Sequence, residues 1–217
     1  MPYELHPSGR LKAYFQERPW QGADPFQAVF LFVGLDANYD PSIEETLPEV
    51  FDYLDDGVAF WRRHGKGVHH PFRLPRYHGT GKKYHDRFAE IGFAPEHAPW
   101  VSFVELLHLP TTGRSTLTPS DLSPDHLRFL ARIFNNGSAK YVILPQGVAR
   151  LMRRTACFPW LPVKPLRSDG DLSVLREQNG QTVFEMYHFS CYGWQLPMLK
   201  RQIAQIGEII RGIRERA

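Results

Sequence analysis

Four short, continuously apolar runs constrain this chain most, because each is long enough for a buried strand and far too short to cross a membrane. They cover residues 28–34, 100–107, 140–144 and 182–189. Runs rich in β-branched and aromatic residues, without a regular polar face, are typical of parallel strands covered on both faces. The chain lacks an apolar stretch of the ~20 residues that a membrane span needs, so we expect no membrane association.

Helical patterns separate these runs. Ser42 and Glu45 have the spacing of a capping box, which predicts a helix start at residue 42. Ser123 followed by Pro124 predicts a second start. The predicted helices cover residues 42–63 (one helix or two), 82–91, 123–134 and the amphipathic segment 196–214. The alternation predicts one domain over residues 1–217, a three-layer α/β/α fold with a central, mainly parallel four-stranded sheet.

Charge is distributed unevenly along a chain whose net charge is only +3. Residues 36–56 hold eight acids and no lysine or arginine, whereas residues 147–167 hold five bases and no acid. Such polarity can orient a polyanion on one face, but two solvated surface segments would give the same pattern. The two cysteines, Cys157 and Cys191, cannot build a disulfide framework, and no apolar leader is visible. We therefore expect a reducing, cytoplasmic location.

Chemistry-bearing residues follow three of the predicted strands. Asp36 follows the first, Glu105 lies at the end of the second, and His188 lies at the end of the fourth. Ligands of open α/β sheets bind at the carboxyl ends of the strands. The sequence therefore predicts that a carboxylate, a second polar group and an imidazole meet at one edge of the sheet.

The motifs at these strand ends resemble the uracil-DNA glycosylase superfamily. Gly34-Leu35-Asp36-Ala37-Asn38 is similar to the motif that the family places after its first strand, and His188-Phe189-Ser190 is similar to its His-Pro-Ser motif. Residues 141–149 resemble the family's third strand and its step into a helix. Each motif is weak by itself, but their order and spacing extend the resemblance over about residues 27–215.

The resemblance implies a DNA base-excision enzyme without cofactor or metal, acting as a monomer on single- or double-stranded DNA. Asp36 would activate the attacking water, and His188 would donate a hydrogen bond to the departing base. Ser190 would contact a phosphate, and Tyr192 would wedge into the space left by the flipped base. The plainer interpretations are a loop-capping aspartate, a structural histidine and a surface aromatic side chain.

Two departures from the family pattern bear on the substrate. Glu105 stands where active uracil enzymes carry a base-reading asparagine, and an ionised glutamate only accepts hydrogen bonds. Unless Glu105 is protonated, it would favour a base with an exocyclic amino group. Asn38 replaces a bulky tyrosine and leaves room for a 5-substituent. These departures predict a modified base rather than plain uracil; alternatively, Glu105 pairs with a nearby arginine such as Arg114.

The segment 71–83 combines aromatic, basic and glycine residues. By the resemblance, Phe72 or Tyr77 would stack on the base. Lys82 and Lys83, next to Gly79 and Gly81, would face a phosphate, as would Arg150 of the basic segment. A plain surface loop would have the same composition.

The sequence also bears on three interpretations other than excision. The spacing of the histidines in this region, His69, His70, His78 and His85, matches no zinc pattern. A non-catalytic nucleic-acid-binding protein of the same fold is the main alternative. An unrelated α/β hydrolase or nucleotide-binding enzyme is disfavoured by the absence of a G-x-S-x-G elbow and of a phosphate fingerprint.

Overall fold

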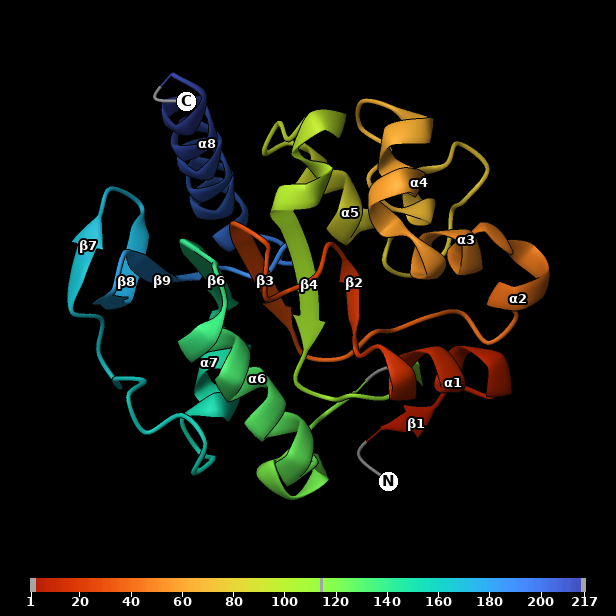
Figure 1. Ribbon diagram of the computed structural model, residues 1–217, viewed down its shortest axis with the longest axis horizontal. Helices are drawn as coiled ribbons and strands as arrows, with labels where there is room; N and C mark the ends of the chain where they lie inside the picture. The colour runs from red at the N-terminus through yellow and green to blue at the C-terminus, as the bar shows by residue number, and fades with distance from the viewer. Residues whose placement is uncertain (1–2, 114, 216–217) are drawn as a thin grey trace.

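A computed structural model describes residues 3–113 and 115–215. The protein is mixed α/β, with helices on both faces of a mixed sheet (Figure 1). The strands are β1 (Glu4–Leu5), β2 (Trp20–Gly22), β3 (Phe30–Gly34), β4 (Val101–Glu105), β5 (Thr111–Thr112), β6 (Tyr141–Pro145), β7 (Arg167–Asp169), β8 (Leu172–Gln178) and β9 (Gln181–Met186). The helices are α1 (Gly9–Glu17), α2 (Ile43–Thr46), α3 (Glu49–Asp55), α4 (Gly57–His64), α5 (Lys82–Ala89), α6 (Pro124–Asn136), α7 (Gln146–Met152) and α8 (Gln195–Arg214). Short 3₁₀ turns cover Pro71–Arg73, Pro95–Trp100 and Pro119–Asp121.

The main sheet is wider than the sequence predicts. Across the described residues it has seven strands in the order β2-β4-β3-β6-β9-β8-β7, rather than four. The four apolar runs form the neighbouring strands β4, β3, β6 and β9, whose pairings are parallel. The added edge strands β2, β8 and β7 pair antiparallel. The sequence does not predict these strands, because β2 and β7 have only three residues each and β8 mixes polar with buried apolar side chains, so none of them forms a continuous apolar run.

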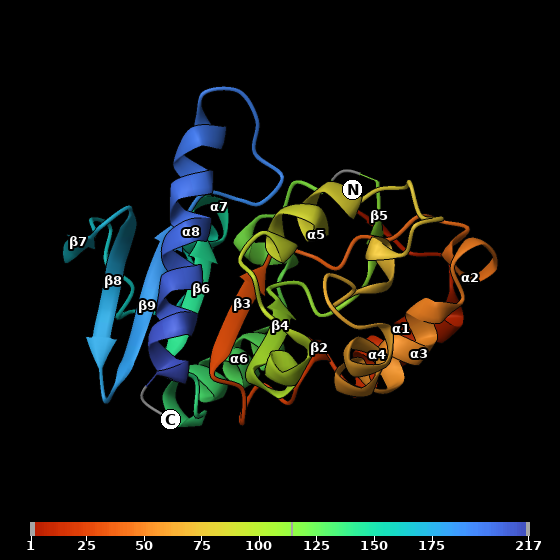
Figure 2. The same ribbon diagram turned by 90° about the horizontal axis from the view of Figure 1, so that it is seen from above.

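Two apolar layers hold the helices to the sheet. On one face α6 and α7 pack through residues such as Leu130 and Val148. On the other face α8 packs through Leu199, Ile203, Ile206 and Ile210, and α5 through Phe88. Figure 2 shows α8 crossing the sheet on the side away from α6. This double covering explains why the parallel strands are continuously apolar.

Three predicted helices are confirmed, as α5, α6 and α8, and one is not. The Ser123 side chain caps α6 by accepting from the His126 N–H, and α8 follows the amphipathic segment closely. The predicted 42–63 helix is instead divided into α2, α3 and α4. Pro48 follows α2, and Asp56 leaves the helical conformation to cap α4. The predicted start at residue 42 is confirmed, since Ser42 is the N-cap of α2. The predicted capping box is wrong, because the Ser42 side chain accepts no hydrogen bond from its helix and instead donates to Asp40 Oδ1.

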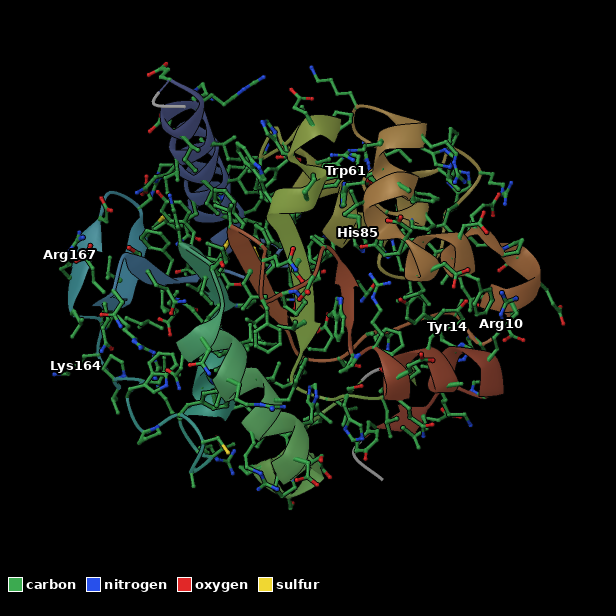
Figure 3. The ribbon with its side chains drawn as sticks, viewed as in Figure 1. Arg10, Tyr14, Trp61, His85, Lys164 and Arg167 are labelled. Carbon is green, nitrogen blue, oxygen red and sulfur yellow. The ribbon has the colours of Figure 1, made fainter. Side chains whose placement is uncertain are left out.

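The acidic and basic segments lie at opposite ends of the molecule. Helices α2 and α3 are at the right of Figure 1, and the loop after α7 is at the left. Figure 3 places Lys164 and Arg167 at the left edge, far from Tyr14 and Arg10 beside α3. Most acids of segment 36–56 have local partners: Asp40 with Ser42, Glu44 with Ser8, Glu49 with Arg76, Asp55 with Tyr14, and Asp56 with the Ala59 N–H. These hydrogen bonds and the Glu49–Arg76 ion pair help to hold helices α1 to α4 and their loops together.

None of the helices in the described ranges has the length and apolar character required to span a bilayer.

The covering of the sheet by α8 gives a stability prediction. Ile206 is fully buried, whereas Ile209 on the same helix is partly buried. Ile206→Ala should lower the free energy of unfolding by about 2–5 kcal/mol, because it leaves a cavity against the strands. Ile209→Ala should cost clearly less. Urea unfolding of the two variants checks this, and equal losses would mean that α8 does not pack as described.

Candidate functional site

A cavity of about 450 Å³ opens at the carboxyl ends of β3, β4 and β9. Its walls come from the loop after β3, the end of β4, helix α5 and the loop after β9. Asp36, Glu105 and His188 all line it. The predicted convergence of these three side chains is therefore confirmed, and it follows from the parallel pairing, which brings the carboxyl ends of the strands to one edge.

Asp36 is held by two hydroxyl groups. The Thr111 hydroxyl and the Ser115 hydroxyl both donate to Asp36 Oδ2, the latter at 2.7 Å. Asn38 Nδ2 in turn donates to Thr111 Oγ1 at 3.1 Å. Hydroxyl donors match a carboxylate, which only accepts. This arrangement fixes Asp36 through one oxygen and leaves Oδ1 to act on a ligand.

Glu105 has the opposite environment. Its Oε2 atom is buried and has no hydrogen-bond partner among the described residues. Burial raises the pKa of the Glu105 carboxyl well above its usual range, and the nearby Asp36 charge raises it further. Glu105 is therefore a neutral acid across a pH range in which ordinary carboxyls are charged. The cavity thus contains two carboxyl groups in different protonation environments.

His188 presents a hydrogen-bond donor to the cavity. The Ser190 N–H donates to His188 Nδ1 at 3.1 Å, so in the neutral imidazole Nε2 carries the proton. The surrounding walls lower the pKa of His188 by desolvation, an effect that Asp36 opposes and Arg87 reinforces. The Tyr84 ring lies beside the imidazole, with centroids 5.5 Å apart. His188 is therefore a neutral, oriented donor near pH 7.

Arg87 fixes the loop that carries His188. This buried side chain of α5 donates to the carbonyl oxygens of Phe189, at 2.6 Å, and Cys191. Tyr84 of the same helix packs edge-on against Phe189, with centroids 5.0 Å apart. Arg87 is thus a positioning residue for His188 and Ser190. Sequence reasoning missed it, because its partners are backbone atoms about 100 residues away.

Three histidines form an uncharged wall beside the cavity. The rings of His70 and His85 are stacked, with centroids 3.8 Å apart, and His69 Nε2 lies 3.0 Å from His85 Nδ1. Desolvation lowers the pKa of His85 to about 3 and those of His69 and His70 well below their usual range. Figure 3 shows His85 on the inner side of α5. Within residues 3–113 and 115–215, no three or more His, Cys, Asp or Glu side chains are arranged to hold a metal ion.

The predicted base-binding residues divide between the cavity wall and the layer behind it. Asn38 lines the cavity, but its amide donates to Thr111 and to the Gly113 carbonyl. Phe72 also lines the cavity, and Tyr77 stacks behind it with centroids 4.4 Å apart. Tyr77 therefore supports the Phe72 ring rather than facing a ligand. Arg114, the alternative partner of Glu105, lies outside the described residues.

The predicted DNA-binding residues lie around the rim or farther away. Ser190 lines the cavity, and Tyr192 is 78% exposed two residues beyond it. Lys82 and Lys83 begin α5 directly after Gly81, which lines the cavity. Arg150 is exposed on α7, outside the cavity wall.

Several lining residues were not singled out from the sequence. Gln21 comes from the unpredicted strand β2, and Ser115, whose hydroxyl donates to Asp36, lies after β5. Thr111 of β5 is not among the lining residues, but its hydroxyl also holds Asp36. Trp194, 74% exposed, adds a second aromatic side chain to the rim loop near Tyr192. No protein-family model matches the sequence, and a search of curated proteins finds no match. Function is therefore inferred from the geometry of the site.

The role of Arg87 gives a prediction. Arg87→Met removes the donor to two carbonyl groups and should lower the free energy of unfolding by about 1–3 kcal/mol. The loop should loosen, so the buried Cys191 thiol should react faster with a thiol reagent in a Cys157→Ser background. Lys83→Met on the exposed face of α5 is the control. Unchanged Cys191 reactivity in Arg87→Met would contradict the positioning role.

Proposed function

We propose that this protein is a DNA glycosylase that flips a damaged or modified base into the cavity and hydrolyses its N-glycosidic bond. The observation that carries the proposal is the meeting of Asp36, Glu105 and His188 in one cavity at the carboxyl edge of the sheet. That arrangement, together with the motif resemblance, supports a divergent member of the uracil-DNA glycosylase superfamily. Excision needs no cofactor beyond water.

Asp36 acts on the sugar side of the reaction. The bond between C1′ and the base nitrogen breaks, and its electron pair leaves with the base. The sugar then carries positive charge, which the Asp36 carboxylate stabilises while Oδ1 orients a water molecule. The water oxygen bonds to C1′ and its proton passes to Asp36. Thr111 and Ser115 keep the carboxylate in place without occupying that oxygen.

His188 acts on the base side. Its Nε2–H donates to a base oxygen on which negative charge develops. Because the Ser190 N–H occupies Nδ1, the tautomer is set before the substrate binds. His188 is solvent-exposed, so the bound base must cover it before a fixed donor contributes the about 2.7–4 kcal/mol typical of one oxyanion-hole donor.

The rim supplies the contacts to DNA. Lys82 and Lys83 stand at the N-terminus of α5, where the helix dipole also favours a phosphate. Tyr192 of the loop after β9 fills the gap left by the flipped base, and Ser190 of the same loop contacts the backbone. Arg150, on α7 and outside the rim, contacts the backbone farther along the strand. Within the described residues the acidic segment has one ion pair, Glu49 with Arg76, and its other acids keep their charge, so the contacts to DNA must avoid helices α2 and α3. The partner is DNA, bound by one copy of the chain in the cytoplasm.

The cavity has room for a modified base. Its volume of about 450 Å³ accommodates a pyrimidine ring that carries an added group. Asn38 lines this space in place of a larger ring. The proposed substrate is therefore a pyrimidine with an added group, rather than plain uracil.

Excision is tested with oligonucleotides that each carry one modified base, followed by alkali cleavage of abasic sites. Asp36→Asn should lower the single-turnover rate by at least ~100-fold, because the variant cannot accept the proton of water. Asp52→Asn, an exposed acid in α3, is the matched control and should act like the wild type. Binding of the oligonucleotides without release of any base would favour the non-catalytic alternative and refute excision.

A further inference from the structure

The Glu105 carboxyl lies in the space that a side chain at position 34 would otherwise fill. In the parallel pairing of β3 with β4, Glu105 stands opposite Gly34. A Cβ atom on residue 34 would lie 1.9 Å from Glu105 Oε2 and 2.6 Å from the carboxyl carbon. Any side chain at position 34 would displace the carboxyl. Glycine here therefore serves the placement of Glu105 at the floor of the cavity.

Nothing in the described surroundings favours a charge on Glu105. Its Oε2 atom is buried without a partner. No lysine or arginine of the described ranges lines the cavity, and the nearest charged group is Asp36. The titratable groups packed around Glu105 come from several elements: Asp36 and Tyr39 after β3, Tyr53 of α3, Tyr84 and His85 of α5, and His188 after β9. A charge on the buried Oε2 atom of Glu105, next to the Asp36 carboxylate, would be costly, so the geometry itself favours the neutral acid.

The two carboxyl groups thus differ in the protonation state that their surroundings favour, as the general acid and the general base of an active site do. Asp36 receives hydroxyl donors, and Glu105 receives none. Where two carboxyls share one site, such a difference separates the group that donates a proton from the group that remains ionised.

We propose that Glu105 is a catalytic general acid that gives its proton to the departing base. This inference rests on the proposed excision activity. As the C1′–N bond breaks and its electron pair moves into the base, the Glu105 proton passes to a ring nitrogen or carbonyl oxygen on the far edge of the base. The base leaves neutral, Glu105 is left as a carboxylate and Asp36 holds the proton taken from water. Asp36 then gives up one proton and Glu105 takes up one, so both groups return to their starting forms.

This role names the substrate class. Bases whose anions are stable leave without receiving a proton. By contrast, 4-amino pyrimidines form unstable anions and need a proton on the ring before they leave. A neutral carboxyl also offers one donor and one acceptor, so it pairs with the ring nitrogen and amino group of such a base. The structure thus points to 5-substituted, amino-bearing pyrimidines as bases that this site is equipped to release.

The experiment compares leaving groups. Single-turnover excision is measured with oligonucleotides carrying 5-fluorouracil, uracil, 5-hydroxymethyluracil or 5-hydroxymethylcytosine. Glu105→Gln keeps the shape, one donor and one acceptor, but has no proton to transfer. The variant should lose at least ~100-fold on the 4-amino base and under ~10-fold on 5-fluorouracil, in line with ordinary general-acid contributions. Glu177→Gln on the exposed strand β8 should match the wild type throughout.

The dependence on pH provides a second readout. The pKa of Glu105 is raised, so the proton-donating form persists above the pH at which ordinary carboxyls ionise and is lost as pH rises through that raised pKa. Wild-type excision of the 4-amino base should fall along this alkaline limb, and Glu105→Gln should lack the limb. Tight binding of an uncleavable oligonucleotide by both proteins shows that the site is intact.

The outcomes separate this inference from the function on which it rests. Equal rate losses in Glu105→Gln for all leaving groups, or a wild-type rate that does not fall at high pH, would overturn the general-acid role. The latter result would mean that a cation such as Arg114 holds Glu105 ionised. If the wild type releases no base and Asp36→Asn behaves identically, excision itself fails.

Discussion

The parallel pairing of β3 with β4 is the constraint on which the rest of the site depends. It places Gly34 beside Glu105, which gives the buried carboxyl its space, and it sends Asp36 into the loop directly above. The β6 and β9 pairings then bring His188 to the same edge. One sheet register therefore determines which polar groups share the cavity. The helices on both faces keep that register dry and rigid.

The parts of the fold that the sequence predicts are those with a strong local signal. The four buried strands and helices α6 and α8 are predicted because their apolar spacing is set by covering the sheet. The convergence of Asp36, Glu105 and His188 follows from the same pattern, since parallel strands end at one edge. The edge strands, the division of 42–63 and the wider sheet depend on pairing between distant residues, which no local window contains.

The supporting contacts of the site were beyond local reasoning for the same reason. Arg87 binds carbonyl groups, Thr111 and Ser115 reach Asp36 from a later loop, and the neutrality of Glu105 depends on what surrounds it. The sequence alone leaves the protonation state of Glu105 open. In the structure, burial raises the pKa of the Glu105 carboxyl and favours its neutral form. The structure also explains the acidic segment. Most of its acids form hydrogen bonds, or in one case an ion pair, with residues around the N-terminal helices.

Helix α5 joins two walls that are otherwise separate in the chain. Tyr84 and His85 face the cavity, while Arg87, less than one turn farther, grips the backbone that carries His188. Because a short helix moves as a rigid body, its displacement would shift the aromatic wall and the imidazole together. The imidazole and the shape of the cavity are thereby mechanically coupled, so a tilt of α5 would change both in the same step.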